Sequence, residues 1–180
     1  GYQWARRANV MLLPVGGDVF VREGGDDAAV RQLTQHGGAI DPKICADGSR
    51  VAFARDRELH VLSVADGRET ALTKGAPQGV TRGQSDFNGQ EEFDEPSGHW
   101  WAPSCDRLAF LEVDETKVDR VPVVGFRDGP DLQHLRYPRA GTTNPTSVST
   151  ARFAGSHCRR AATSDACAGR TTATRSTPST

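Results

Sequence analysis

The sequence predicts an all-β fold, a partial β-propeller of about three blades. Residues 1–145 contain short strands that alternate apolar and polar residues between turn signals. A unit made of a turn, an apolar triplet, a second turn and an alternating strand recurs along them, and repeats of about 40–45 residues are typical of blades. A β-sandwich is the alternative all-β arrangement, and the repeated unit favours blades.

The first unit begins with the apolar run at residues 10–15. The Gly16-Gly17 pair is a two-residue turn signal, and an alternating strand follows at residues 18–22. A loop at residues 24–27 and a further short strand at residues 30–34 complete the unit.

The second unit repeats this pattern. A strand at residues 50–54 follows the turn Asp47-Gly48-Ser49, and another strand at residues 59–64 precedes the turn Asp66-Gly67. A short strand at residues 69–73 ends the unit.

The third unit starts at Trp100-Trp101-Ala102-Pro103 and continues through residues 107–111 to a strand at 118–124. The apolar segments at residues 10–13 and 51–53 start 41 residues apart, whereas those at 51–53 and 108–110 start 57 apart. The surplus lies between Lys74 and Gly98, which predicts an insertion there.

Residues 146–180 have a different composition. Ala, Thr, Ser and Arg make up 26 of these 35 residues, and Phe153 is the single aromatic residue. Such a segment buries too little apolar area to offset its ordering entropy, so we predict that residues 146–180 are disordered. An Arg-, Ala- and Thr-rich stretch is also typical of a GC-rich gene read out of frame. Two interpretations stay open, a frameshift near Thr146 and a natural disordered tail.

Charge and cysteine content exclude several classes of function. The net charge of −1 gives no field of one sign for nucleic acid or an anionic membrane. No apolar run reaches 18 residues, so we expect no membrane span. The spacing of the cysteines fits no zinc motif, and no phosphate-binding loop occurs, so we expect no metal and no cofactor. The cysteines are Cys45, Cys105, Cys158 and Cys167.

The predicted insertion carries two adjacent carboxylates, Glu91 and Glu92, within Gln90-Glu91-Glu92-Phe93-Asp94. Adjacent carboxylates repel, which raises the proton affinity of one of them unless a cation is present. The α-ammonium of a peptide is such a cation, and each charge-assisted hydrogen bond to it contributes about 1.5–3 kcal/mol. Glu91 and Glu92 are therefore candidate ligands of a peptide N-terminus. The alternative is a solvated surface pair, the common situation for glutamates.

Several motifs in the same order resemble the dipeptidyl peptidase IV family of serine exopeptidases, especially the branch of dipeptidyl peptidases eight and nine. Asp41-Pro42-Lys43-Ile44-Cys45 resembles its D-P-K-I-C element. The Glu91-Glu92 motif with Gly98-His99-Trp100-Trp101-Ala102-Pro103 resembles Q-E-E-F-D…G-Y-W-W-x-P. Val113-Asp114-Glu115 resembles its V-D-E, and residues 136–145 resemble R-Y-P-x-x-G-x-x-N-P. The resemblance covers nearly all of residues 1–145 and none of the tail.

The resemblance implies an eight-bladed propeller joined to an α/β-hydrolase domain, in an enzyme that is usually a homodimer. It implies that Glu91 and Glu92 lie on a short helical insertion and hold the substrate's N-terminal amine in the central cavity. The enzyme then releases dipeptides, usually with proline or alanine second.

Departures from the family pattern limit what this chain does alone. No G-x-S-x-G nucleophile elbow occurs, and Ser156 lacks the flanking glycines. The family's substrate-binding arginine would lie upstream of Gly1. We therefore assign no catalytic residue, and predict that the chain by itself is inactive and needs the hydrolase domain. The compartment stays open between cytoplasm and periplasm.

The leading prediction is the substrate-recognition propeller of a dipeptidyl aminopeptidase. The alternative is a non-catalytic propeller that binds a protein or peptide, since propellers host many unrelated functions. A nucleic-acid binder acting through the tail arginines would require a steep salt dependence that we do not expect.

Overall fold

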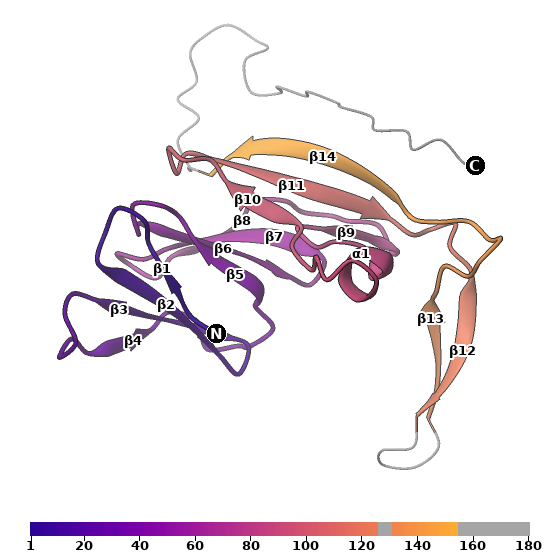
Figure 1. Cartoon of the computed structure of the whole chain (residues 1–180), viewed down its shortest axis with the longest axis horizontal. Helices are drawn as coiled ribbons and strands as arrows, with labels where there is room; N and C mark the ends of the chain where they lie inside the picture. The colour runs from indigo at the N-terminus through magenta and orange to yellow at the C-terminus, as the bar shows by residue number, and fades with distance from the viewer. Residues whose placement is uncertain (126–130, 155–180) are drawn as a thin grey trace, which may run out of the picture.

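The computed structural model describes residues 1–125 and 131–154, which form three antiparallel sheets, a separate hairpin and one short helix (Figure 1). The three sheets follow one another along the chain. The first two sheets each join four consecutive strands, the arrangement of a propeller blade, and the third joins β9, β10 and β14 to β11. The predicted all-β partial propeller is confirmed. The described residues contain no helix long and apolar enough to cross a bilayer.

The first sheet has the strand order β1-β2-β3-β4. Strands β2 and β3 are joined at Gly16-Gly17, where both glycines have positive φ, 60° and 80°. This is the backbone that a two-residue hairpin requires and that glycine adopts without steric cost. The strands are β1 (Gln3–Trp4), β2 (Val10–Val15), β3 (Asp18–Glu23) and β4 (Val30–Gln32).

The second sheet has the order β5-β6-β7-β8. Its strand β6 is buried from Val51 to Ala54, because a middle blade packs against a neighbour on each face. This explains why the apolar run of β6 is continuous, whereas a strand buried on one face alternates apolar and polar residues. The strands are β5 (Ile40–Ile44), β6 (Arg50–Arg55), β7 (Glu58–Ser63) and β8 (Glu69–Ala71).

The third sheet has β11 at its centre, with β14 on one side and β9 and β10 on the other. Between β9 and β10 the chain leaves the sheet and forms helix α1 (Phe87–Glu91). The insertion expected between Lys74 and Gly98 therefore lies within this blade. The strands are β9 (Val80–Arg82), β10 (His99–Trp101), β11 (Arg107–Asp114) and β14 (Thr146–Phe153).

Two predictions are wrong, one about the third unit and one about the start of the tail. The segment at 118–124 does not extend the blade, because β12 (Arg120–Gly125) pairs with β13 (Asp131–Arg136) in a hairpin that projects away from the sheets (Figure 1). Thr146–Phe153, expected to be disordered, instead pairs with β11 along its whole length. Main-chain ladder bonds and β-branched Thr and Val favour this strand despite its low apolar content. Residues 155–180 of the predicted tail lie outside the described part.

Two hydrophobic clusters join the three blades. One combines buried residues of the first two sheets, including Leu12, Val21 and Phe53. The other combines Ala52 and Leu59 of the second sheet with Leu108 and Phe110 of the third. The alternation along β6 sends Phe53 to one cluster and Ala52 to the other, since successive side chains of a strand point to opposite faces.

The first strands of the three sheets lie next to one another. Gln3 of β1 donates its side-chain amide to the Pro42 carbonyl of β5, at 3.0 Å. Lys43 of β5 donates to the His99 carbonyl of β10 at 2.8 Å, and Trp101 Nε1 of β10 donates to the Lys43 carbonyl at 2.9 Å. In a propeller, blades are arranged around a central channel, so these contacts mark the side of the sheets on which that channel lies.

Candidate functional site

The insertion that carries helix α1 interrupts the first strand of the third blade. β9 pairs with residues 112–114 of β11, and β10 pairs with residues 108–110 of the same strand, along the same edge. Together β9 and β10 take the place that β1 and β5 take in the other two sheets. The insertion therefore leaves the sheet on the side where the first strands meet.

The two ends of the insertion are held together at its base. The Gly83 N–H donates to the Leu111 carbonyl at 2.9 Å, and the Leu111 N–H donates to the Gly98 carbonyl at 2.8 Å. Gln84 and Ser97 form a β-bridge. A Cβ at Gly98 would lie 2.3 Å from the Gln84 backbone, so this closure requires glycine. Residues 84–97 are thereby presented as one closed loop.

Side-chain hydrogen bonds fix the short helix inside this loop. Asp86 caps its N-terminus by accepting from the Gly89 N–H at 2.8 Å. Gln90 donates to the Ser85 carbonyl at 2.7 Å, and the Ser85 hydroxyl donates to the Glu95 carbonyl at 2.7 Å. A five-residue helix is unstable by itself, so these bonds hold its end in place.

Glu91 and Glu92 lie at the C-terminal end of this helix. Glu91 is its last residue and Glu92 its C-cap, whose N–H donates to the Asn88 carbonyl at 2.9 Å. Both side chains are exposed, and neither takes part in an ion pair or side-chain hydrogen bond with the residues that the structure describes. Helix C-terminal carbonyls carry partial negative charge, so two carboxylates there favour a bound cation. Phe93, which follows, is 77% exposed.

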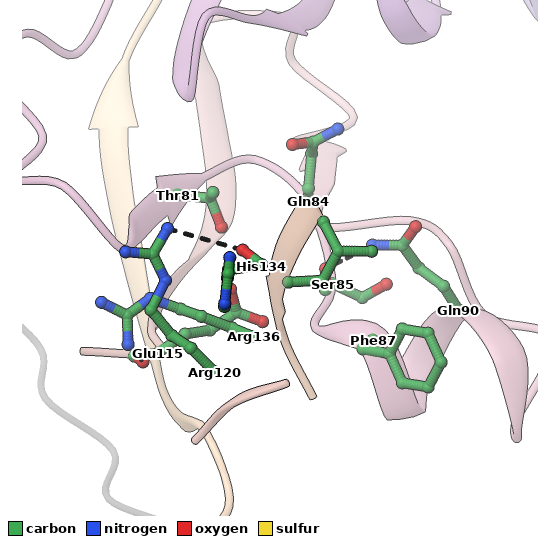
Figure 2. Close-up of a pocket in the computed structure, with 10 residues that line it drawn as sticks. Thr81, Gln84, Ser85, Phe87, Gln90, Glu115, Arg120, His134 and Arg136 are labelled. Atoms are coloured by element: carbon green, nitrogen blue, oxygen red, sulfur yellow. Dashed lines mark hydrogen bonds between the residues drawn. The ribbon is translucent and has the colours of Figure 1, made fainter. Parts of the chain in front are cut away.

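An open pocket of about 410 Å³ lies beside the helix (Figure 2). Phe87 and Gln90 line it from the helix, and Arg120, His134 and Arg136 line it from the β12–β13 hairpin. Figure 2 shows the bond from Arg120 Nη2 to the His134 carbonyl, at 3.4 Å. Glu91 and Glu92 do not line this pocket, so the residues that sequence reasoning selected and the cavity beside them are separate features.

Glu115, which lines the same pocket, has a perturbed pKa. Burial raises the pKa of its carboxyl above the usual range, and the nearby carboxylate of Asp86 raises it further, whereas Arg136 opposes the shift. The Arg136 guanidinium is held by the Glu115, Thr116 and Val118 carbonyls, at 2.6, 3.0 and 3.1 Å. Sequence reasoning missed Glu115 as a titrating group because the two charged groups that act on it, Asp86 and Arg136, lie far from it in the sequence.

His99, Trp100 and Trp101 form β10, and their side chains point alternately to opposite faces of the sheet. His99 is fully buried, and its Nδ1 lies 2.8 Å from the Gly83 carbonyl. Burial lowers its pKa, so the neutral ring donates Nδ1–H to that carbonyl. Trp100 is 42% exposed with the Lys43 ammonium 5.5 Å from its ring, whereas Trp101 packs against the second hydrophobic cluster.

Successive antiparallel sheets whose first strands lie side by side, with a helical insertion in the third sheet, define a propeller region. The chain matches the family described as the dipeptidyl peptidase IV N-terminal region over residues 13–165, and it belongs to that family. The match extends beyond residue 145, so the expectation that the resemblance ends there is wrong.

Named relatives agree with this assignment. Human dipeptidyl peptidase 8 is 25% identical over 80% of this chain, and dipeptidyl aminopeptidase B of Saccharomyces cerevisiae is 28% identical over 53%. A solved structure from Bacteroides ovatus, named as a dipeptidyl aminopeptidase IV, is 27% identical with a TM-score of 0.63 and covers 85% of this chain. The chain spans 19% and 12% of the two relatives and 21% of the solved chain.

Proposed function

We propose that this chain is the substrate-recognition propeller region of a dipeptidyl aminopeptidase, in which Glu91 and Glu92 bind the free N-terminal amine of a peptide. The observation that carries the proposal is the position of their helix. The helix lies in the insertion between β9 and β10, which interrupts the first strand of the blade. This insertion is on the side of the sheets that faces the channel in a propeller.

The chemistry of the pair supports the same assignment. Two exposed carboxylates without a cationic partner among the described residues, next to helix C-terminal carbonyls, form an acceptor site for a cation. An α-ammonium offers three N–H donors in one small charged group. Two charge-assisted hydrogen bonds to it contribute about 1.5–3 kcal/mol each.

Because its helix is held rigidly, the site sets the distance between the bound peptide N-terminus and the catalytic nucleophile. The closed base at Gly83 and Gly98 and the Asp86 cap fix the helix end relative to the blade. A carboxylate pair at a fixed place holds the peptide N-terminus at a fixed distance from a nucleophile in another domain. An enzyme with this arrangement releases dipeptides. We propose that its substrates carry proline or alanine in the second position.

Catalysis in this proposal belongs to an α/β-hydrolase domain that supplies the Ser, Asp and His. The propeller region contributes binding energy and orientation, which convert an encounter into a positioned complex. The family's usual homodimer is the assembly we propose for the whole enzyme.

Neutral variants of the two glutamates test the proposal. In the whole chain, Glu91→Gln and Glu92→Gln should each weaken binding of an Ala-Pro-initiated peptide about tenfold or more, measured by calorimetry, because one charge-assisted bond is lost. Glu95→Gln is the matched control, since it removes the same charge from the same loop. Equal weakening in all three variants would show a general charge effect and contradict a specific amine site.

A further inference from the structure

A second cluster of reactive side chains lies between the second and third blades. Cys45 directly follows β5, and Cys105 lies in the turn between β10 and β11. Both thiols are free and buried, at 0% and 2% exposure. The two sulfurs and a carboxylate oxygen of Asp47 all lie within 4.8 Å of one another. Three potential ligands from two blades therefore converge on one point.

Direct contacts join these three residues. The Cys45 thiol donates to Asp47 Oδ1 at 2.9 Å, and the Asp47 N–H donates to the Cys105 sulfur at 3.4 Å. Ser49 also donates its hydroxyl to Asp47 Oδ1, at 2.6 Å. The carboxylate is thus held toward the sulfurs, while the exposed side of Asp47 leaves a route from solvent.

The backbone at Cys105 is in a conformation that cysteine rarely adopts. Its φ is 61°, in the left-handed region that favours glycine. The turn aims the Cys105 sulfur at the Asp47 backbone in spite of this cost. Strain of this kind often accompanies a functional position, and here it accompanies a second thiol at contact distance.

We propose that Cys45, Asp47 and Cys105 bind one thiophilic divalent cation of the zinc type, which joins the second and third blades. Two thiolates and one carboxylate are ligands that Zn²⁺ takes in proteins, and sulfur ligands select against Mg²⁺ and Ca²⁺. The fourth position is left to water or to the Ser49 hydroxyl, which lies 3.6 Å from the Cys45 sulfur.

Charge balance at the cluster agrees with a divalent ion. Two thiolates and a carboxylate carry three negative charges, and a bound divalent cation reduces the net charge of the site to −1. The Arg7 guanidinium, 3.9 Å from the Cys105 sulfur and 2.8 Å from the Pro103 carbonyl, offsets that charge. Each thiol gives up its proton when the metal binds, so binding of one ion by two thiols releases two protons to water.

Cobalt provides the test, because Co²⁺ replaces Zn²⁺ and gives a sulfur-to-metal charge-transfer band. The whole chain is used with Cys158→Ser and Cys167→Ser, so that Cys45 and Cys105 are the remaining thiols. We expect the band to saturate at one Co²⁺ per chain and to disappear when one equivalent of Zn²⁺ is added. A band that is absent, or that needs a large excess of Co²⁺, overturns the proposal.

Variants identify the ligands. Asp47→Asn, at an exposed position, should weaken Zn²⁺ binding on the order of tenfold or more, measured with a chromophoric chelator. Asp66→Asn is the matched control, because Asp66 accepts from the Arg68 N–H in a similar turn without a thiol nearby.

Cys105→Ser should abolish the band while circular dichroism stays unchanged. If Cys105→Ser unfolds, the Asp47→Asn result decides the question. Equal affinities in Asp47→Asn, Asp66→Asn and the parent chain, or a Cys45–Cys105 disulfide that persists under reductant, would overturn the proposal.

Discussion

Thr34 and Thr73 occupy the same position in two successive blades. Thr34 accepts the Val19 N–H at 2.9 Å and donates to Asp18 at 2.8 Å. Thr73 accepts the Leu59 N–H at 2.9 Å and donates to Glu58 at 2.5 Å. Each threonine is 5% exposed and joins the end of its blade's fourth strand to the start of the third. The repeat therefore includes a polar contact as well as the strands.

Valine at either threonine position should destabilise the chain. Thr34→Val or Thr73→Val leaves a buried backbone N–H without an acceptor, which costs about 1–3 kcal/mol. Urea unfolding measures the difference. Thr34→Ser and Thr73→Ser keep the hydroxyl and lose one methyl group, which costs about 0.8 kcal/mol. If the valine variants are as stable as the serine variants, the hydroxyl contacts do not stabilise the blade.

Glu58 should make stability depend on pH. Burial acts to raise its pKa, but hydrogen bonds from Thr73, the Ala76 N–H and Arg82 outweigh burial and hold the pKa below its usual value of 4.5. A carboxyl with a lowered pKa stabilises the fold above its unfolded pKa, and that contribution is lost as pH falls through the folded value. We expect Glu58→Gln to cost about 1.5–3 kcal/mol at pH 7.

The cost of Glu58→Gln should shrink as pH falls below about 4.5, measured as the difference in unfolding free energy from the parent chain. Glu23→Gln is the control, because Glu23 forms a half-exposed ion pair with Arg31. Such pairs contribute about 0–1 kcal/mol. A Glu58→Gln cost that is the same at pH 7 and well below pH 4 would contradict the assigned role of the carboxylate.

Protonation of His99 should lower the unfolding free energy of the chain in mild acid. Burial lowers its pKa below 6.5, so the folded state disfavours the imidazolium. A depressed histidine pKa gives stability that is present above the unfolded value and is lost as pH falls through the folded value. We expect the unfolding free energy to decrease below about pH 6.5. In His99→Asn, which keeps an N–H donor near Gly83 and has no titrating group, this decrease should be absent. Parallel pH profiles for the two proteins would contradict the prediction.

Much of the blade architecture could be predicted from the sequence. Gly16-Gly17, the apolar triplet at 51–53 and the turn at Asp66-Gly67 are local signals, and their structures are set by residues close to them in the chain. The insertion near Glu91 was predictable because it lengthens one repeat by a measurable amount. These features depend on spacing and turn chemistry, which a sequence displays directly.

Features that depend on distant partners could not be predicted. Strand β14 was missed because Thr146–Phe153 is defined by pairing with β11, and its composition carries no hydrophobic signal. The segment at 120–125 has the alternation of a blade strand, yet it pairs with β13 in a separate hairpin. The Cys45–Cys105 cluster was invisible for the same reason, since 58 residues separate Asp47 from Cys105.

The central claim is that Glu91 and Glu92 bind a peptide's free amine, and blocking that amine tests it most directly. The measurement is the dissociation constant of an Ala-Pro-initiated peptide for the whole chain at pH 7, compared with that of its N-acetylated form. Acetylation removes the positive charge and two N–H donors. We predict that the acetylated peptide binds at least about tenfold more weakly. Equal dissociation constants for the two peptides would contradict the account.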